Sequence, residues 1–223
     1  MPPDGNASYR LECLRRLAAD EQLKSPVIMK RFLALLMSLA WILSFAVSAK
    51  PEEPLPNGFR KSTWGMTKEQ VKATEDSQPK IERENILIYK GKVAELDADI
   101  AFIFADRKLV RAKSLFLAQH TNQNDFISDF DTVKKVLKDK YGSPKKEDAF
   151  WSDDLYKDEP QRWGFAVSLG HLSYFSIWDD EKTIITLSLR GENYEISHAV
   201  EYLSKQLQHL EDEASKKKQK SDF

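Results

Sequence analysis

Pairs of carboxylates are the residues in this sequence that come closest to a catalytic or metal-binding pattern. Asp97 and Asp99 stand two residues apart, which would place both side chains on one face of a strand. Two further acidic pairs stand at 153–154 and 179–180. Such pairs could serve a glycoside hydrolase or hold Ca²⁺. No twelve-residue Ca²⁺ loop accompanies them, and acidic residues favour turns for backbone reasons, so we expect solvated turn and edge residues.

The histidines and glycines form none of the common catalytic motifs. The four histidines are His120, His171, His198 and His209, and no two of them have the spacing of a zinc protease. We expect all four on the solvated surface. The eight glycines build neither a phosphate-binding loop nor a Gly-x-Ser-x-Gly turn. We therefore expect no catalytic residue, no cofactor and no metal, and keep a hydrolase with carboxylates from distant loops as a third hypothesis.

Aromatic residues give the candidate interface. Trp151, Tyr156 and Trp163 flank or interrupt the polar stretch 152–161, which has no strand pattern. Aromatic side chains beside an exposed loop are typical of binding hot spots. The alternative is that the same rings anchor the core, because each buries some 150–250 Å².

Composition limits the class of protein in which these residues must be placed. The chain has 223 residues, 34 Lys and Arg against 35 Asp and Glu, and a net charge of −1. This is an ordinary globular composition, and its balance argues against a nucleic-acid partner. The length predicts one domain or two small ones.

The first fifty residues indicate export. Met29, Lys30 and Arg31 precede an uncharged stretch at 32–49 that ends in Val-Ser-Ala. A basic start, an apolar middle and a small-residue end describe a signal peptide over 29–49, and the length also allows an uncleaved inner-membrane anchor. Both interpretations place residues 50–223 outside the cytoplasm, with membrane contact only through 32–49 if that segment is kept. We interpret residues 1–28 as an upstream segment that is not translated.

The remaining chain predicts a linker, an α+β domain and a tail. Residues 50–58 are rich in Pro and charge, 59–210 carry periodic patterns, and 211–223 form a charged flexible tail. The single cysteine, Cys13, precedes the apolar stretch, so a disulfide or Cys-based metal site is not expected in the exported part.

Periodicity predicts about three helices and an antiparallel sheet. Helices are expected from Thr67 to about Pro79, over 124–141 before Gly142, and over 194–210. Alternating apolar residues predict a long hairpin over 100–116 that turns at 106–108. Further strands are expected at 86–89, 163–168, 172–178 and 183–189.

A faint internal repeat suggests two like halves. Residues 67–71 resemble 132–136, and 104–115 resemble 178–189. If the repeat is real, the halves 59–119 and 120–210 each contain a helix followed by antiparallel strands, and their sheets could join.

Two short motifs resemble a known group of envelope proteins. The segment Trp-Gly-Met-Thr-Lys-Glu-Gln-Val at 64–71 is similar to the entry to the first helix of SmpA/OmlA-type small envelope domains. Tyr-Gly-Ser-Pro at 141–144 resembles the Gly-x-Pro that ends a helix in that group. The doubled form of this unit resembles the beta-lactamase-inhibitor-protein fold. The lipid-bearing cysteine of the SmpA-like proteins is absent here, and the resemblance implies a scaffold or protein-binding role.

The sequence thus predicts an exported cell-envelope protein that is not an enzyme and that binds another envelope protein, through a sheet face or through the loop aromatics. A module that binds an apolar or cell-wall-derived small ligand between helix and sheet is the alternative.

Overall fold

A computed structural model describes residues 54–221 of the chain, and the predicted upstream segment and signal peptide lie outside this part. Among the described residues, no helix is both long and apolar enough to cross a membrane. The strands are β1 (Gly58–Phe59), β2 (Ser62–Thr63), β3 (Ile81–Arg83), β4 (Ile86–Val93), β5 (Leu96–Ala105), β6 (Lys108–Phe116), β7 (Lys146–Trp151), β8 (Leu172–Asp179), β9 (Thr183–Glu192) and β10 (Glu195–Ser204). The helices are α3 (Lys68–Thr74), α4 (Asp125–Tyr141), α5 (Trp163–Ser168) and α6 (Gln208–Ser221), with a 3₁₀ turn at Pro160–Arg162.

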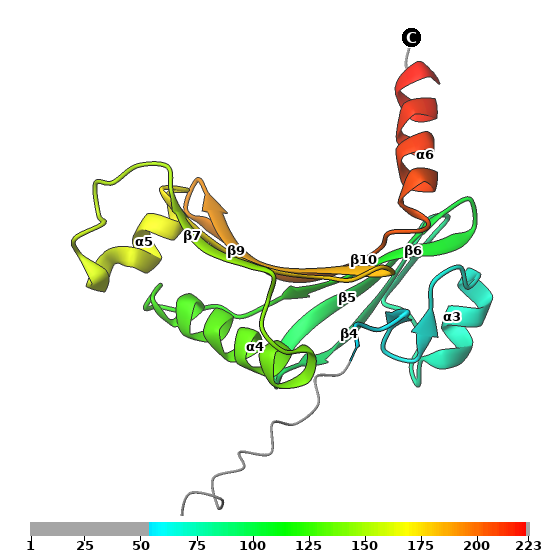
Figure 1. The fold of residues 1–223 in the computed structure, drawn as a ribbon, viewed down its shortest axis with the longest axis horizontal. Helices are drawn as coiled ribbons and strands as arrows, with labels where there is room; N and C mark the ends of the chain where they lie inside the picture. Colours follow the sequence, from blue (N-terminus) through cyan, green and yellow to red (C-terminus); the bar gives the residue numbers. More distant parts are fainter. Residues whose placement is uncertain (1–53, 222–223) are drawn as a thin grey trace, which may run out of the picture. The chain divides into compact units, whose positions relative to one another are not determined.

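One antiparallel sheet of eight strands organises the protein, and together with four helices in the described part of the chain it confirms the predicted α+β class (Figure 1). Its order is β3-β4-β5-β6-β10-β9-β8-β7, and β1 and β2 form a separate two-stranded ribbon. The chain therefore runs through α3 and four neighbouring strands, and then through α4 and four more. The two sets of strands meet where β6 pairs with β10 over residues 111–115 and 199–203.

Tight two-residue turns connect three of the strand pairs. Both residues of each turn have positive φ: Ala94 and Glu95, Asp106 and Arg107, and Asn193 and Tyr194. Turns of this kind match the right-handed twist of paired strands, although glycine or asparagine usually fills them. The turn at 106–107 confirms the hairpin predicted over 100–116.

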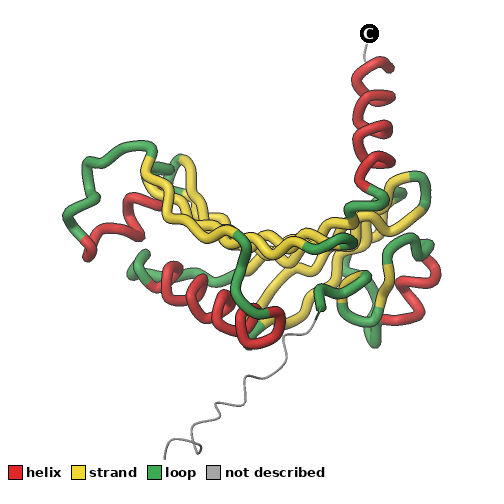
Figure 2. Tube along the Cα trace, viewed as in Figure 1, coloured by secondary structure: helices red, strands yellow, loops and turns green. Residues whose placement is uncertain are grey.

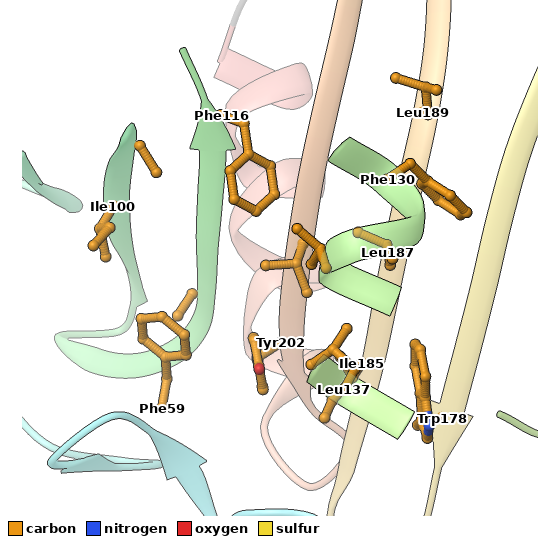
Figure 3. Packing of buried hydrophobic residues seen from close by; sticks show 14 of the residues in the cluster. Phe59, Ile100, Phe116, Phe130, Leu137, Trp178, Ile185, Leu187, Leu189 and Tyr202 are labelled. Carbon is orange, nitrogen blue, oxygen red and sulfur yellow. The ribbon is translucent and has the colours of Figure 1, made fainter. Parts of the chain in front are cut away.

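Helices cover one face of the sheet, which we call the covered face. Figure 2 shows α4 against this side of the strands, and α5 packs on β8, β9 and β10. Phe130 and Leu137 of α4 lie against Ile185, Leu187 and Leu189 of β9 (Figure 3). Under α3, Val71 is completely buried in the same hydrophobic cluster. The core therefore lies in a single layer between the helices and the sheet.

Local signals explain where α3 begins and where α4 ends. The Thr67 side chain accepts a hydrogen bond from the Gln70 backbone N–H, and the Gln70 side chain accepts one from the Thr67 N–H. This reciprocal pair is the predicted capping box. Gly142 ends α4 with a φ of 78°, a conformation that glycine adopts easily, and its N–H donates to the Lys138 carbonyl. The predicted end of α4 is thereby confirmed.

The strand predicted at 163–168 was wrong, because these residues form α5. The segment contains Trp, Phe and Val, which favour strands, but contacts with the backbone before α4 stabilise a helical turn instead. Gly164 donates its N–H to Asn124 Oδ1 at 2.6 Å, and a side chain there would overlap the Gln123 backbone. The long-range contact with the start of α4 overrides local propensity.

The helix predicted over 194–210 was also wrong. Residues 195–204 are β10, which pairs with both β6 and β9, and α6 follows from 208 to 221. The apolar residues of this segment fit a helical period, but its buried residues also include His198, Val200, Tyr202 and Ser204, which alternate as in a strand. Residues 211–221, expected as a charged tail, are helical.

Candidate functional surface

The three aromatic residues of the predicted interface lie in one cluster beside α5. The Trp151 and Trp163 rings meet edge to face with centroids 6.1 Å apart. The Tyr156 ring stacks on His171 at 6.0 Å and meets Phe165 edge to face at 5.5 Å. Trp163 also donates its indole N–H to the Lys157 carbonyl at 3.1 Å. The loop at 152–162 is thus held in place by contacts among the aromatic residues within it and at its two ends.

This aromatic cluster is half-buried. Each of Trp151, Tyr156 and Trp163 packs against the hydrophobic core while keeping part of its surface accessible. The Arg162 guanidinium covers the Tyr156 ring at 4.5 Å from its centroid, which further shields it. The most accessible apolar side chain of this loop is Leu155, which is 65% exposed. In this geometry the three predicted interface residues cover one end of the hydrophobic core.

Within the described residues, the other face of the sheet carries no helix except the start of α6, and we call it the open face. The strand registers align its side chains in rows across the sheet. The middle row crosses all eight strands and contains Ile81, Ile88, Ala101, Lys113, Glu201, Thr186, Ile177 and Lys146. The rows on either side contain Arg83, Ile86, Ile103, Arg111, Leu203, Ile184 and Asp179, and Lys90, Asp99, Leu115, Ala199, Ser188, Phe175 and Asp148.

Apolar residues fill an unusually large part of the open face. An antiparallel sheet with one solvated face normally alternates apolar and polar side chains. Here β4 presents Ile86 and Ile88 on the open face, and β5 and β9 present Ile103 and Ile184. Further along the face, Leu115 and Leu117 are 39% and 40% exposed, and Phe150 is 57% exposed. Leu115 and Leu117 lie at the end of β6, and Phe150 lies four strands away on β7, with half-buried apolar side chains on the strands between them. Such a surface gains free energy when it is covered.

Charges on the open face are balanced, and one of them connects it to α6. Arg111 donates to Glu201 at 3.3 Å, and its Nε and Nη2 both donate to one Glu211 oxygen at 3.1 and 2.7 Å. Asp99 accepts from Lys80 at 2.8 Å. These partners pair opposite charges within the chain, so the face as a whole carries no strong charge of either sign.

Most carboxylates of the three acidic pairs are held by lysines or by turn backbone. Asp97 and Asp99 share the open face, as predicted, but Asp99 is held by Lys80. Lys205 and Lys145 bind Asp179, and the hydrogen bond from Lys205 is the main cause that lowers the Asp179 pKa. Asp180 accepts from the backbone N–H groups of residues 182 and 183.

The acidic pair at 153–154 also has a structural explanation. Asp153 accepts a hydrogen bond from the Leu155 backbone N–H at 2.9 Å, and Asp154 pairs with Lys157. Asp153 and Asp180 therefore do what acidic residues commonly do in turns, as predicted, whereas Asp179 is the last residue of β8 and is held by lysines. Across residues 54–221, no group of three or more His, Cys, Asp or Glu side chains is placed to hold a metal ion.

The prediction of a surface position was wrong for His198. This histidine is 3% exposed on the covered face of β10. Its ring stacks on Phe116 at 4.2 Å and lies 6.0 Å from Phe130 of α4, and neither ring nitrogen has a hydrogen-bond partner among the described residues. Burial lowers the pKa of His198 from 6.5 to about 4, and the nearby Asp129 carboxylate opposes part of this shift. His198 is therefore a neutral core residue at pH 7.

Sequence reasoning also missed the apolar open face. The signal was present in strands whose successive residues are all apolar, such as Ile-Leu-Ile at 86–88 and Ile-Ala-Phe-Ile-Phe-Ala at 100–105. Such runs supply apolar side chains to both faces of a sheet. No known protein family, curated protein or solved structure matches this chain.

Proposed function

We propose that this chain is an exported, non-enzymatic module that binds another protein of the cell envelope, and that the open face is its binding surface. Export rests on the basic, apolar and small-residue pattern of residues 29–49. The binding role rests on the open face. Its occupant would be a folded protein with an apolar centre and a rim of mixed charge, to match the balanced charges of this face.

The observation that carries the proposal is the exposure of Leu115, Leu117 and Phe150 on a face that already contains rows of isoleucine. Burial of apolar surface stabilises a complex by roughly 25 cal/mol per Å². The broad, strand-built arrangement of these residues suits another protein surface, because small ligands prefer concave and enclosed sites.

Two further points support a binding role over catalysis. Of the three carboxylate pairs, Asp99, Asp154 and Asp179 are held by lysines, and Asp153 and Asp180 accept from turn backbone. The resemblance of 64–71 and 141–144 to SmpA/OmlA-type domains, and of the doubled unit to the beta-lactamase-inhibitor-protein fold, also favours a scaffold role. A helix and four strands are followed by a second helix and four strands, with α5 inserted after β7, and this succession is compatible with that resemblance.

The proposal can be tested with matched surface variants. Leu115→Lys and Leu117→Lys each remove an exposed leucine from the open face. The new ammonium group at position 115 would face Asp99 across the strands, so no like charges are opposed. Val136→Lys on α4 is the control, since Val136 is 47% exposed and lies on the helix layer. Partners are captured by crosslinking in native envelopes, and the identified protein is then titrated in purified form.

We expect the two leucine variants to weaken binding of the purified partner by at least about tenfold, with an unchanged melting temperature. Val136→Lys should bind like the wild type. Equal binding by all variants, or the failure of any captured protein to bind directly, would contradict the proposal.

A further inference from the structure

Strand β7 leaves the longer of the two sheet edges open. The sheet ends in β3, with three residues, and in β7, with six. The Ser152 N–H donates to the His171 carbonyl of the neighbouring chain segment at 2.8 Å. Hydrogen bonding alternates along a strand, so residues 146, 148 and 150 also face β8. The N–H and C=O groups of Glu147, Ala149 and Trp151 therefore point away from the sheet.

The usual protection of such an edge is weakened here. Charged side chains commonly keep edge strands from pairing with other chains. On β7, however, Lys146 is drawn over the Phe175 ring at 4.9 Å, and Glu147 is held by Lys134 and Lys138 of α4 at 2.9 and 2.7 Å. Two of the three charges of β7 are thus folded onto their own subunit, while Asp148 remains exposed and Phe150 is 57% exposed beside the free backbone.

We propose that β7 pairs antiparallel with β7 of a second copy of this chain, around a two-fold axis at Ala149. In this register Ala149 lies opposite Ala149, and Glu147 lies opposite Trp151 of the second copy. These are the residues whose backbone groups point outward, so the hydrogen bonds between the copies are reciprocal. The two eight-stranded sheets then become continuous.

Side chains favour this register over the one centred on Asp148. On the open face, each Asp148 lies opposite Phe150 of the second copy, and the two Phe150 side chains become diagonal neighbours within reach of each other. A register centred on Asp148 would place the two Asp148 carboxylates directly opposite each other, which is unfavourable. The register at Ala149 sets no like charges opposite each other within 146–152.

The test measures the mass of the native protein in solution by light scattering over a range of concentrations. Mass spectrometry gives the mass of the monomer. At high protein concentration we expect light scattering to give twice that mass, which is the mass of a dimer. Ala149→Pro removes an N–H that the subunit itself does not use and should raise the dimer Kd by at least about tenfold. Its melting temperature should stay close to that of the wild type, because the bonds between β7 and β8 are kept.

A pair of charge variants tests the register itself. Phe150→Asp would set two carboxylates opposite each other and should abolish the dimer. Phe150→Lys would set an ammonium opposite Asp148 and should retain it. Equal effects of the two variants would overturn the proposed register.

Other outcomes would contradict pairing of β7 with a second copy in any register. A protein that stays monomeric at all concentrations overturns the proposal, and so does a dimer that survives Ala149→Pro with its fold intact. If the wild type is monomeric but Ala149→Pro abolishes binding of a separate envelope protein, β7 pairs with that partner instead. Phe150 belongs to the open face, so the Phe150 variants are judged by self-association alone. Ala149→Pro changes no residue of the open face, so its failure leaves the proposed function standing.

Discussion

Replacing His198 with Met should flatten the dependence of stability on acid pH. The imidazole is buried between Phe116 and Phe130, and burial lowers its pKa from 6.5 to about 4. Between these two values the unfolded chain binds a proton that the folded chain does not. Protonation of His198 in the unfolded chain therefore does not reduce the free energy of unfolding above pH 6.5, and reduces it progressively as the pH falls toward 4.

The size of the effect follows from the two pKa values. From pH 7 to pH 4.5, a group that titrates at 6.5 when unfolded and at about 4 when folded changes the free energy of unfolding by about 2.5 kcal/mol. Met has a similar volume, does not titrate, and leaves no ring nitrogen buried without a partner. The variant should therefore be at least as stable as the wild type at pH 4.5.

Urea denaturation at pH 7 and pH 4.5, followed by circular dichroism, measures both proteins. The wild type should lose about 2.5 kcal/mol more than His198→Met over this interval. A nuclear magnetic resonance titration of the imidazole gives the folded pKa directly. Parallel pH dependences in the two proteins, or an imidazole that titrates near 6.5, would refute the reasoning.

Four further changes test other parts of the fold. Thr67→Ala breaks the capping box of α3 and should cost about 1 kcal/mol in urea denaturation, whereas Thr67→Ser should cost less. Gly164→Ala forces a methyl group into the Gln123 backbone and should cost about 3 kcal/mol, seen as a clear drop in melting temperature. Trp151→Ala should lower the free energy of unfolding by about 2 kcal/mol if the ring anchors the core, and unchanged stability with lost partner binding would assign it to an interface. Arg111→Met removes the bonds to Glu201 and Glu211, so amide exchange at the start of α6 should accelerate while global stability falls by no more than about 1 kcal/mol.

Local signals were sufficient for the elements whose ends carry their own chemistry. The capping box at Thr67, the glycine at 142 and the alternation over 100–116 each describe a structure that neighbouring residues stabilise without distant help. The antiparallel α+β class followed from these elements.

The wrong predictions concern segments whose secondary structure or burial depends on residues far away in the sequence. The segment 194–204 fits a helix by spacing, but β6 and β9 offer backbone partners on both sides, and no local rule contains that information. His198 was assigned to the surface through the same mistake, because a strand turns alternate residues inward. The open face depends on the full strand order, which sequence patterns alone could not give.

The junction of β6 with β10 also has a consequence for the order of assembly. β10 is the last strand of the sheet to be synthesised, and it fills the gap between β6, which is made much earlier, and β9, which is made just before it. Until residue 204 has emerged, the edge of β6 has no neighbour, and long-range pairings of this kind form slowly. The first half must therefore wait for the final strand, and a chain that stopped before β10 would leave the backbone edges of β6 and β9 unpaired in the centre of its sheet.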